Sequence, residues 1–288
     1  MNIYFINLSQ KTTEVYFRIF TKAGRLSEPF EQQGMGHLLD HYINGKIFQK
    51  YFNLETNAHI DSSNLWFSLN TEKKKALKDI KKFMNMVVNP DFDDKELLGF
   101  EKQTLINEMR VEEVVVYNNL FEKVLESTFL ENNYRSIYGE ISKISSYSLE
   151  DLKNYHQNII GKHGVIVFVG GYKMEARFKK AVESLVDNYL KYDNILPKLR
   201  PMKFAHPDEK YIDLPAKDKG QALVYLVDRT FGHKDPTERI IASNIIFREL
   251  AGHKKNSPFL SLRKLGVYGL RYAHMVNEEF GMVVLSAI

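Results

Sequence analysis

The sequence predicts an α+β protein, and three observations lead to this prediction. Segments in which polar and apolar residues alternate, as in antiparallel strands, are interspersed with segments whose apolar residues recur every three or four positions, as in helices. The length of 288 residues leaves room for one large domain or two of ordinary size. Three prolines within residues 196–207 interrupt these patterns and favour a linker. We therefore expect a first domain over residues 1–195 and a second over residues 208–288.

The first half of the predicted first domain starts with strands and continues with helices. Residues 12–23 alternate in the strand manner and end at Gly24. Residues 57–69 alternate again and predict a second strand. Residues 71–88 and 93–110 have apolar positions at helical spacing, so each predicts an amphipathic helix.

The second half of this domain combines helices with a buried strand. Ser148 opens a helix, and Asp151 is placed three positions later as the far member of a capping-box-like pair. Residues 164–172 form a short apolar run between glycines, which is the pattern of a buried strand. Residues 176–189 predict an amphipathic helix, and helical patterning also covers residues 120–129. These elements make the first domain complete.

The predicted second domain is shorter. Residues 223–227 predict a strand and residues 237–250 a helix. The chain then stops at GMVVLSAI, an apolar, strand-like run. An uncovered edge strand invites pairing with another strand. We therefore expect the second domain to be incomplete, or to finish against another element.

Composition excludes several classes of protein. The formal charge is only +4, from 40 basic and 36 acidic residues, and short lysine runs such as residues 73–75 fit a solvated helix face. We therefore expect no nucleic-acid partner. No apolar run approaches the roughly 20 residues that span a bilayer, and the N-terminus lacks a signal-peptide pattern. The chain has no cysteine, which excludes disulfides and thiolate metal sites and suits a reducing compartment. A cytoplasmic location is the expectation.

The stretch GMGHLLDHY, residues 34–42, places two histidines four positions apart. On a helix, His37 and His41 share one face with their Cβ atoms about 5–6 Å apart, so both imidazoles can reach one zinc ion. Asp40 points about 100° round the helix, where it can face a water molecule instead of the metal. Two surface histidines beside an ordinary acid are the alternative that the motif alone leaves open.

Glu101 and Glu108 form a second acidic element. They are seven positions apart and therefore share one face of the helix predicted over residues 93–110. An isolated pair of this kind is usually an exposed acidic stripe. Here apolar residues surround the helix and argue against full exposure. A carboxylate of this helix can therefore supply the third protein ligand that a catalytic zinc site needs.

These residues resemble the insulinase/pitrilysin family of zinc peptidases, especially its mitochondrial-processing-peptidase-like branch. The family's inverted zinc motif is H-x-x-E-H, and AGRLSEPFEQQGMGHLLDH is similar to its opening strand, loop and zinc helix. Asn57-Ala58 resembles the dipeptide that begins the strand beside the active site, and NPDFDDKELLGFEKQTLINEMR resembles the helix with two glutamates. The stretch YRSIYGEISKISSYSLEDLKNYHQNIIGKHGVIVFVGG is similar to the end of the first domain. The pieces follow the family's order over nearly the whole chain.

The resemblance implies a role for each residue of the motif. His37, His41 and Glu108 match the metal ligands, and Glu101 matches the acid that supports the site from behind the ligands. Where the family has a glutamate as general base, this chain has Asp40, whose carboxylate is withdrawn by about one C–C bond, or about 1.5 Å. A misplacement near 1 Å can cost about 10²-fold in rate. Zinc binding is therefore expected, with less efficient catalysis.

Arg263 and Tyr268 resemble the pair with which the family's second domain grips substrate or the transition state, although their spacing is shorter than usual. Ordinary loop and strand residues are the alternative for this pair. The family closes as a clamshell of two halves, each with two related domains of mostly antiparallel sheet packed with helices. The resemblance thus implies that the second domain is of the same type as the first, and that a homodimer or a partner subunit completes the clamshell.

The function that the resemblance implies is zinc-dependent hydrolysis of peptides or small unfolded proteins. The alternative is a catalytically weak or inactive homologue that serves as a structural or substrate-holding subunit. Asp40 and the shortened chain both favour that alternative.

Overall fold

The computed structural model describes residues 2–21, 23–61, 64–114, 139–162, 165–190, 224–230, 235–251, 261, 264, 270–276 and 281–287. The chain divides into two compact units. Unit 1 comprises Met1–Val114 and Arg135–Arg200, and unit 2 comprises Val115–Tyr134 and Pro201–Ile288.

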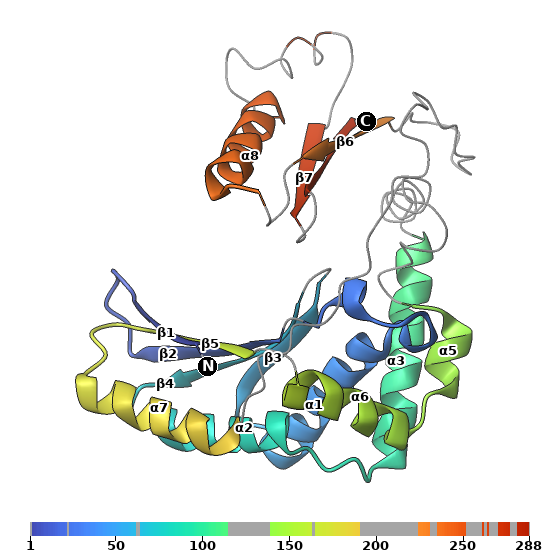
Figure 1. Cartoon of the computed structure of the whole chain (residues 1–288). Helices are drawn as coiled ribbons and strands as arrows, with labels where there is room; N and C mark the ends of the chain where they lie inside the picture. Colours follow the sequence, from blue (N-terminus) through green and yellow to red (C-terminus); the bar gives the residue numbers. More distant parts are fainter. Residues whose placement is uncertain are drawn as a thin grey trace. The chain divides into compact units, whose positions relative to one another are not determined.

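Unit 1 is built on one five-stranded sheet with the order β1-β5-β2-β4-β3 (Figure 1). Its strands are β1 (Asn2–Asn7), β2 (Glu14–Thr21), β3 (Glu55–Ile60), β4 (Leu65–Glu72) and β5 (Val165–Gly171). β1 pairs parallel with β5, and every other neighbouring pair is antiparallel. The predicted α+β class is therefore confirmed, and β3 forms one edge of the sheet.

One face of this sheet is buried, and burial alternates from residue to residue along β2, β4 and β5. In β2, Val15, Phe17 and Ile19 are buried, whereas Tyr16 and Arg18 between them are exposed. The helices of unit 1 are α1 (Met35–Lys50), α2 (Ala76–Val88), α3 (Lys95–Val114), α5 (Ile141–Ser146), α6 (Leu149–Lys162) and α7 (Ala176–Tyr189). Figure 1 shows α1, α2 and α7 on one side of the sheet.

Helix α1 occupies the centre of this packing. It contacts β3 and β4 of the sheet and also α2, α3 and α6. Its apolar residues at helical spacing, among them Leu38, Tyr42 and Ile43, are fully buried. Two short 3₁₀ turns, η1 (Arg25–Ser27) and η2 (Phe30–Gln32), lead from β2 into this helix. The polar Asp40 on this helix is therefore buried among packed neighbours.

Unit 2 contains a three-stranded antiparallel sheet with the order β6-β8-β7. Its described elements are β6 (Val224–Thr230), α8 (Thr237–Ala251), β7 (Leu270–Val276) and β8 (Gly281–Ala287). Helix α8 packs against β7 and β8, and Met282 and Val283 of β8 are buried. The strand and helix predicted at residues 223–227 and 237–250 are thus present. The predicted linker at residues 196–207 and the helical pattern at residues 120–129 lie outside the described residues.

The single strand predicted over residues 57–69 is wrong. The structure has two antiparallel strands there, β3 and β4, joined by a tight turn. Asp61 closes this turn by backbone hydrogen bonding to Asn64, and its Oδ1 accepts a second bond from the Asn64 amide at 2.8 Å. The polar cluster between the two apolar segments is a hairpin signal that alternation alone does not reveal.

The helix predicted from residue 71 begins only at Ala76, because Thr71 still pairs with Val15 in the sheet. The capping pair predicted at the start of α6 is present. The Ser148 hydroxyl accepts a bond from the Asp151 amide at 3.2 Å, and the Asp151 carboxylate accepts one from the Ser148 amide at 2.8 Å. Among the residues that the structure describes, no helix combines the length and the apolar composition needed to cross a membrane.

Candidate metal centre

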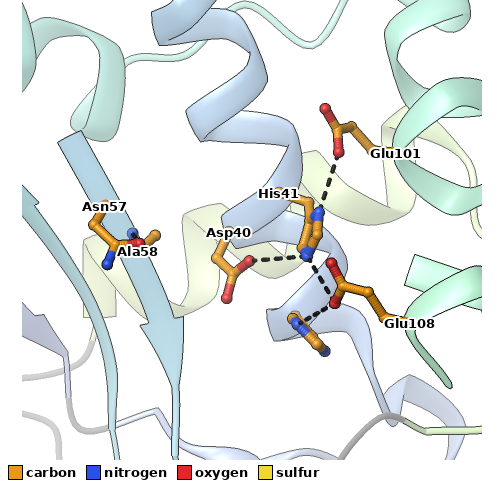
Figure 2. Close-up of polar contacts among 7 residues, drawn as sticks. Asp40, His41, Asn57, Ala58, Glu101 and Glu108 are labelled. Atoms are coloured by element: carbon orange, nitrogen blue, oxygen red, sulfur yellow. Dashed lines mark hydrogen bonds and ion pairs between the residues drawn. The ribbon is translucent and has the colours of Figure 1, made fainter. Parts of the chain in front are cut away.

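Two imidazoles of α1 and one carboxylate of α3 converge on the same space. Glu108 Oε2 lies 3.8 Å from His37 Nε2 and 3.6 Å from His41 Nε2. The two rings are one helical turn apart, with their centroids separated by 5.0 Å. The structure thus brings together the three residues that the sequence pattern proposes as ligands, and Figure 2 shows Glu108 facing His41.

Glu101 approaches the same histidine from the other side of the ring. His41 Nδ1 donates a hydrogen bond to Glu101 Oε2 at 3.1 Å, and the Glu101 residue is only 8% exposed. This bond favours the tautomer with the proton on Nδ1. Figure 2 shows the other ring nitrogen, Nε2, facing Glu108. Gly45 makes the approach possible, because a Cβ at that position would lie 2.8 Å from Glu101 Oε1.

Asp40 is buried beside His41 rather than open to solvent. Its Oδ1 lies 4.0 Å from His41 Nε2, and the residue is 5% exposed. Side-chain atoms of His37, Asp40 and His41 all lie within 4.8 Å of one another, so these three residues also form a group that could hold a metal ion. Two carboxylates, Asp40 and Glu108, therefore compete for the position of third ligand.

The charges of these groups follow from their surroundings. Burial lowers the pKa of His37 to about 3, so its imidazole is neutral at neutral pH and suited to metal binding. Burial also lowers the pKa of His41, but its hydrogen bond to Glu101 and the nearby charges of Asp40 and Glu108 outweigh burial and raise it. Burial raises the pKa of Asp40 to about 8. A cation placed between these groups would favour the charged form of each carboxylate.

The strand next to the site is the sheet edge β3. Asn57 Oδ1 accepts a hydrogen bond from the Ala58 amide at 2.9 Å, and Figure 2 places this dipeptide across from Asp40. The outer edge of such a strand presents backbone groups that can pair with another extended chain. Arg263 and Tyr268, the other two predicted site residues, lie outside the described residues.

Glu28 is a buried carboxylate beside the site that sequence reasoning missed. It lies in the loop before α1, is 5% exposed, and accepts hydrogen bonds from the amides of Gly34 and Gly36. One sequence signal was available. The helix begins after a glycine and has no Ser, Thr, Asp or Asn at its first position to satisfy its amides. A side chain from elsewhere must therefore do so.

Solved structures share this arrangement of elements. A protease from Helicobacter pylori matches with a TM-score of 0.81 and 16% identity, over 99% of this chain and 71% of that protein. Pitrilysin matches with a TM-score of 0.73 and 14% identity, over 99% of this chain and 32% of its own. The fold is similar to that of about a third of pitrilysin. A chain of complex III2 from Candida albicans, with Inz-5 bound, matches with a TM-score of 0.75 and 14% identity, over 99% of this chain and 69% of its own.

At these identities the likeness to pitrilysin concerns the fold. Neither a scan against family models nor a search of curated proteins gave a match to this sequence. This chain spans about a third of pitrilysin, so activity, substrates and partners of the larger protein do not transfer with the fold.

Proposed function

We propose that this protein is a zinc-dependent peptidase that acts on peptides or small unfolded proteins. The observation that carries the proposal is the approach of Glu108 Oε2 on one helix to within 3.8 Å of both His37 Nε2 and His41 Nε2 on the other. The solved peptidases of the same fold support the reaction class.

The donor set fits zinc. Four ligands at about 2.0–2.1 Å in a tetrahedron are about 3.3 Å apart, so the observed separations of 3.6 and 3.8 Å need side-chain shifts of only a few tenths of an ångström. We assign the third ligand to Glu108 rather than Asp40, because its carboxylate approaches both Nε2 atoms and its half-exposed side chain can adjust. Bound zinc would supply a Lewis acid that activates water and polarises the scissile carbonyl.

Each of the remaining residues has a part in this proposal. Asp40 would take a proton from the attacking water and pass it to the leaving amine. Glu101 would hold the His41 ring in its ligating tautomer. The edge strand β3 would hold an extended peptide by backbone hydrogen bonds alongside Asp40. Arg263 and Tyr268 would contact the peptide backbone or the developing oxyanion, as the family resemblance implies.

A second candidate function is a catalytically weak or inactive subunit that holds a substrate or partner. Two observations favour it. The base position carries Asp40, which is shorter than the family's glutamate, and one structure of this fold belongs to the assembled complex III2. For either function we propose that a second copy or a partner subunit completes the peptide-binding chamber.

Two measurements on the purified full chain test the proposal and separate the candidates. Metal content per chain is determined by elemental analysis, and cleavage of a quenched fluorescent peptide library is followed with and without a chelator. The peptidase proposal expects about one zinc per chain and chelator-sensitive cleavage. Zinc without cleavage would favour the subunit, and a chain that takes up no zinc would contradict the metal site.

A further inference from the structure

The N-terminal turn of α1 is held by a side chain from the preceding loop rather than by its own first residue. Glu28 Oε2 accepts a hydrogen bond from the Gly34 amide at 2.9 Å, and Glu28 Oε1 accepts one from the Gly36 amide at 2.6 Å. Amides in the first turn of a helix have no partner within the helix, and negative charge is favourable there. Glu28 therefore satisfies two amides immediately before His37.

Two tyrosines from a distant part of unit 1 fix this loop. The Tyr155 hydroxyl donates to Glu28 Oε1 at 3.2 Å, and the Tyr147 hydroxyl donates to the Gln33 carbonyl oxygen at 2.8 Å. Both tyrosines are buried. Tyr155 lies in α6, and Tyr147 directly precedes Ser148, the first residue of the capping pair. The start of α1 is thus tied to the α6 region through side chains, in addition to its packing.

The space around this turn is closely filled. A Cβ at Gly36 would lie 2.4 Å from Ile60 Cδ1, 2.8 Å from Glu28 Oε1 and 3.0 Å from the Tyr155 hydroxyl oxygen. Gly34 has φ of 80°, a left-handed conformation that favours glycine. Both glycines therefore allow the carboxylate to reach the helix.

We propose that Glu28 is a positioning residue, whose carboxylate sets the direction of the first turn of α1 so that the His37 imidazole faces His41 and Glu108. The inference rests on the proposed metal site. A short capping side chain would satisfy these amides at lower cost, since burying a carboxylate is expensive. Burial raises the pKa of Glu28 to about 7, and its three hydrogen bonds and the nearby Arg25 act against that rise.

The test compares Glu28→Gln with Glu31→Gln in the full chain. Glu31 lies in the same loop with an exposed side chain and serves as the matched control. The amide of glutamine offers one acceptor oxygen where the carboxylate offers two, so one of the two helix amides loses its partner. Hydrogen exchange of the metal-free protein is measured by mass spectrometry, and zinc affinity by competition with a chromophoric chelator.

Glu28→Gln is expected to speed exchange at residues 34–38 at least tenfold, to leave exchange in α2 and α7 unchanged, and to weaken zinc binding by about 10–100-fold, as for residues that orient ligands. Glu31→Gln is expected to change neither. Wild-type exchange at residues 34–38 in Glu28→Gln would overturn the inference, whether or not the chain binds zinc. Faster exchange in every helix would also overturn it, since that is a loss of global stability.

A third outcome is faster exchange at this turn in Glu28→Gln together with a wild-type chain that binds no zinc. It would support the role of Glu28 in holding the turn and contradict the proposed function. If Glu28→Gln does not fold, Tyr155→Phe removes a single donor to the carboxylate. It is expected to give the same local pattern with a smaller, few-fold loss of zinc affinity. Unchanged exchange and affinity in that variant would then overturn the inference.

Discussion

Helix α1 contacts Glu28 at its N-terminal turn and Glu108 further along, and the surroundings of these two carboxylates differ. At its N-terminus, Glu28 is enclosed and accepts hydrogen bonds of 2.6 and 2.9 Å from backbone amides. One turn further, the half-exposed Glu108 lies 3.6 and 3.8 Å from two imidazole nitrogens, beyond hydrogen-bond distance. The protein itself supplies the hydrogen-bond donors to Glu28. At Glu108 the carboxylate and the two imidazoles are close but not hydrogen-bonded, and a cation between them could bind all three. This difference separates a residue that would build the site, Glu28, from a residue that would bind the metal ion, Glu108.

The largest effect is expected at the open contact. Glu108→Gln removes an anionic ligand and should weaken zinc binding by more than about 100-fold, beyond the loss typical of residues behind the ligands. Glu96→Gln, an exposed substitution on the same helix, should leave zinc affinity unchanged. Competition with a chromophoric chelator measures both, and circular dichroism checks that each variant is folded. Equal affinity in the two variants would remove Glu108 from the ligand set.

Asp40 decides between the two candidate functions. Asp40→Asn should abolish peptide cleavage and keep zinc affinity within a few fold, because the proposed ligands are unchanged. Asp40→Glu should raise the cleavage rate by about 10²-fold if the short side chain limits catalysis. Rates on a quenched peptide and zinc affinity are measured for both. If Asp40→Asn loses zinc as strongly as Glu108→Gln, then Asp40 is the third ligand.

The open contact was predictable from the sequence, and the enclosed one was not. Spacings of four and seven residues put His37 with His41, and Glu101 with Glu108, on single helix faces, and the structure has both pairs as predicted. The resemblance to a known motif then predicted that these two helix faces share one metal site. Glu28 acts through backbone amides across a loop, and no periodicity encodes such a contact.

The same limit applies to the fold. Strands and helices with a strong period, such as residues 12–23 and 176–189, are found where the pattern predicts them. The strand β1 was missed. Its parallel partner β5 lies more than 150 residues away, and local alternation does not predict a pairing at that separation. The hairpin at Asp61 was missed because the alternation on either side resembles one continuous strand, and the polar cluster that interrupts it at residues 61–64 was not recognised as a turn.

The enclosed carboxylate should make stability depend on pH. Burial raises the pKa of Glu28 from 4.5 to about 7, so the folded chain binds this proton more tightly than the unfolded chain does. As the pH rises from about 4.5 to about 7, this group should lower the free energy of unfolding by up to about 3 kcal/mol. Arg25 and the phenols of Tyr147 and Tyr155 are the neighbouring polar groups, and burial raises the pKa of both phenols further above this range.

Urea unfolding of the wild type and Glu28→Gln at several pH values measures this dependence. The difference in free energy between the two proteins isolates Glu28 from the other titrating groups of the chain. A difference that stays constant between pH 4.5 and 7 would show that Glu28 keeps an ordinary pKa in the folded chain.

Glu101 combines the two kinds of surroundings, and its substitution should give the smallest effect of the four predictions. It is enclosed like Glu28, yet its hydrogen bond ends on His41, whose other nitrogen faces Glu108. Glu101→Gln keeps an acceptor for His41 Nδ1 but removes the charge, so zinc affinity should fall by about 10–100-fold while the fold is retained. Glu101→Ala also removes the acceptor and should weaken zinc further. If both variants bind zinc like the wild type, packing alone orients the His41 ring. The buried carboxylates around the site would then matter less for metal binding than the contrast between Glu28 and Glu108 suggests.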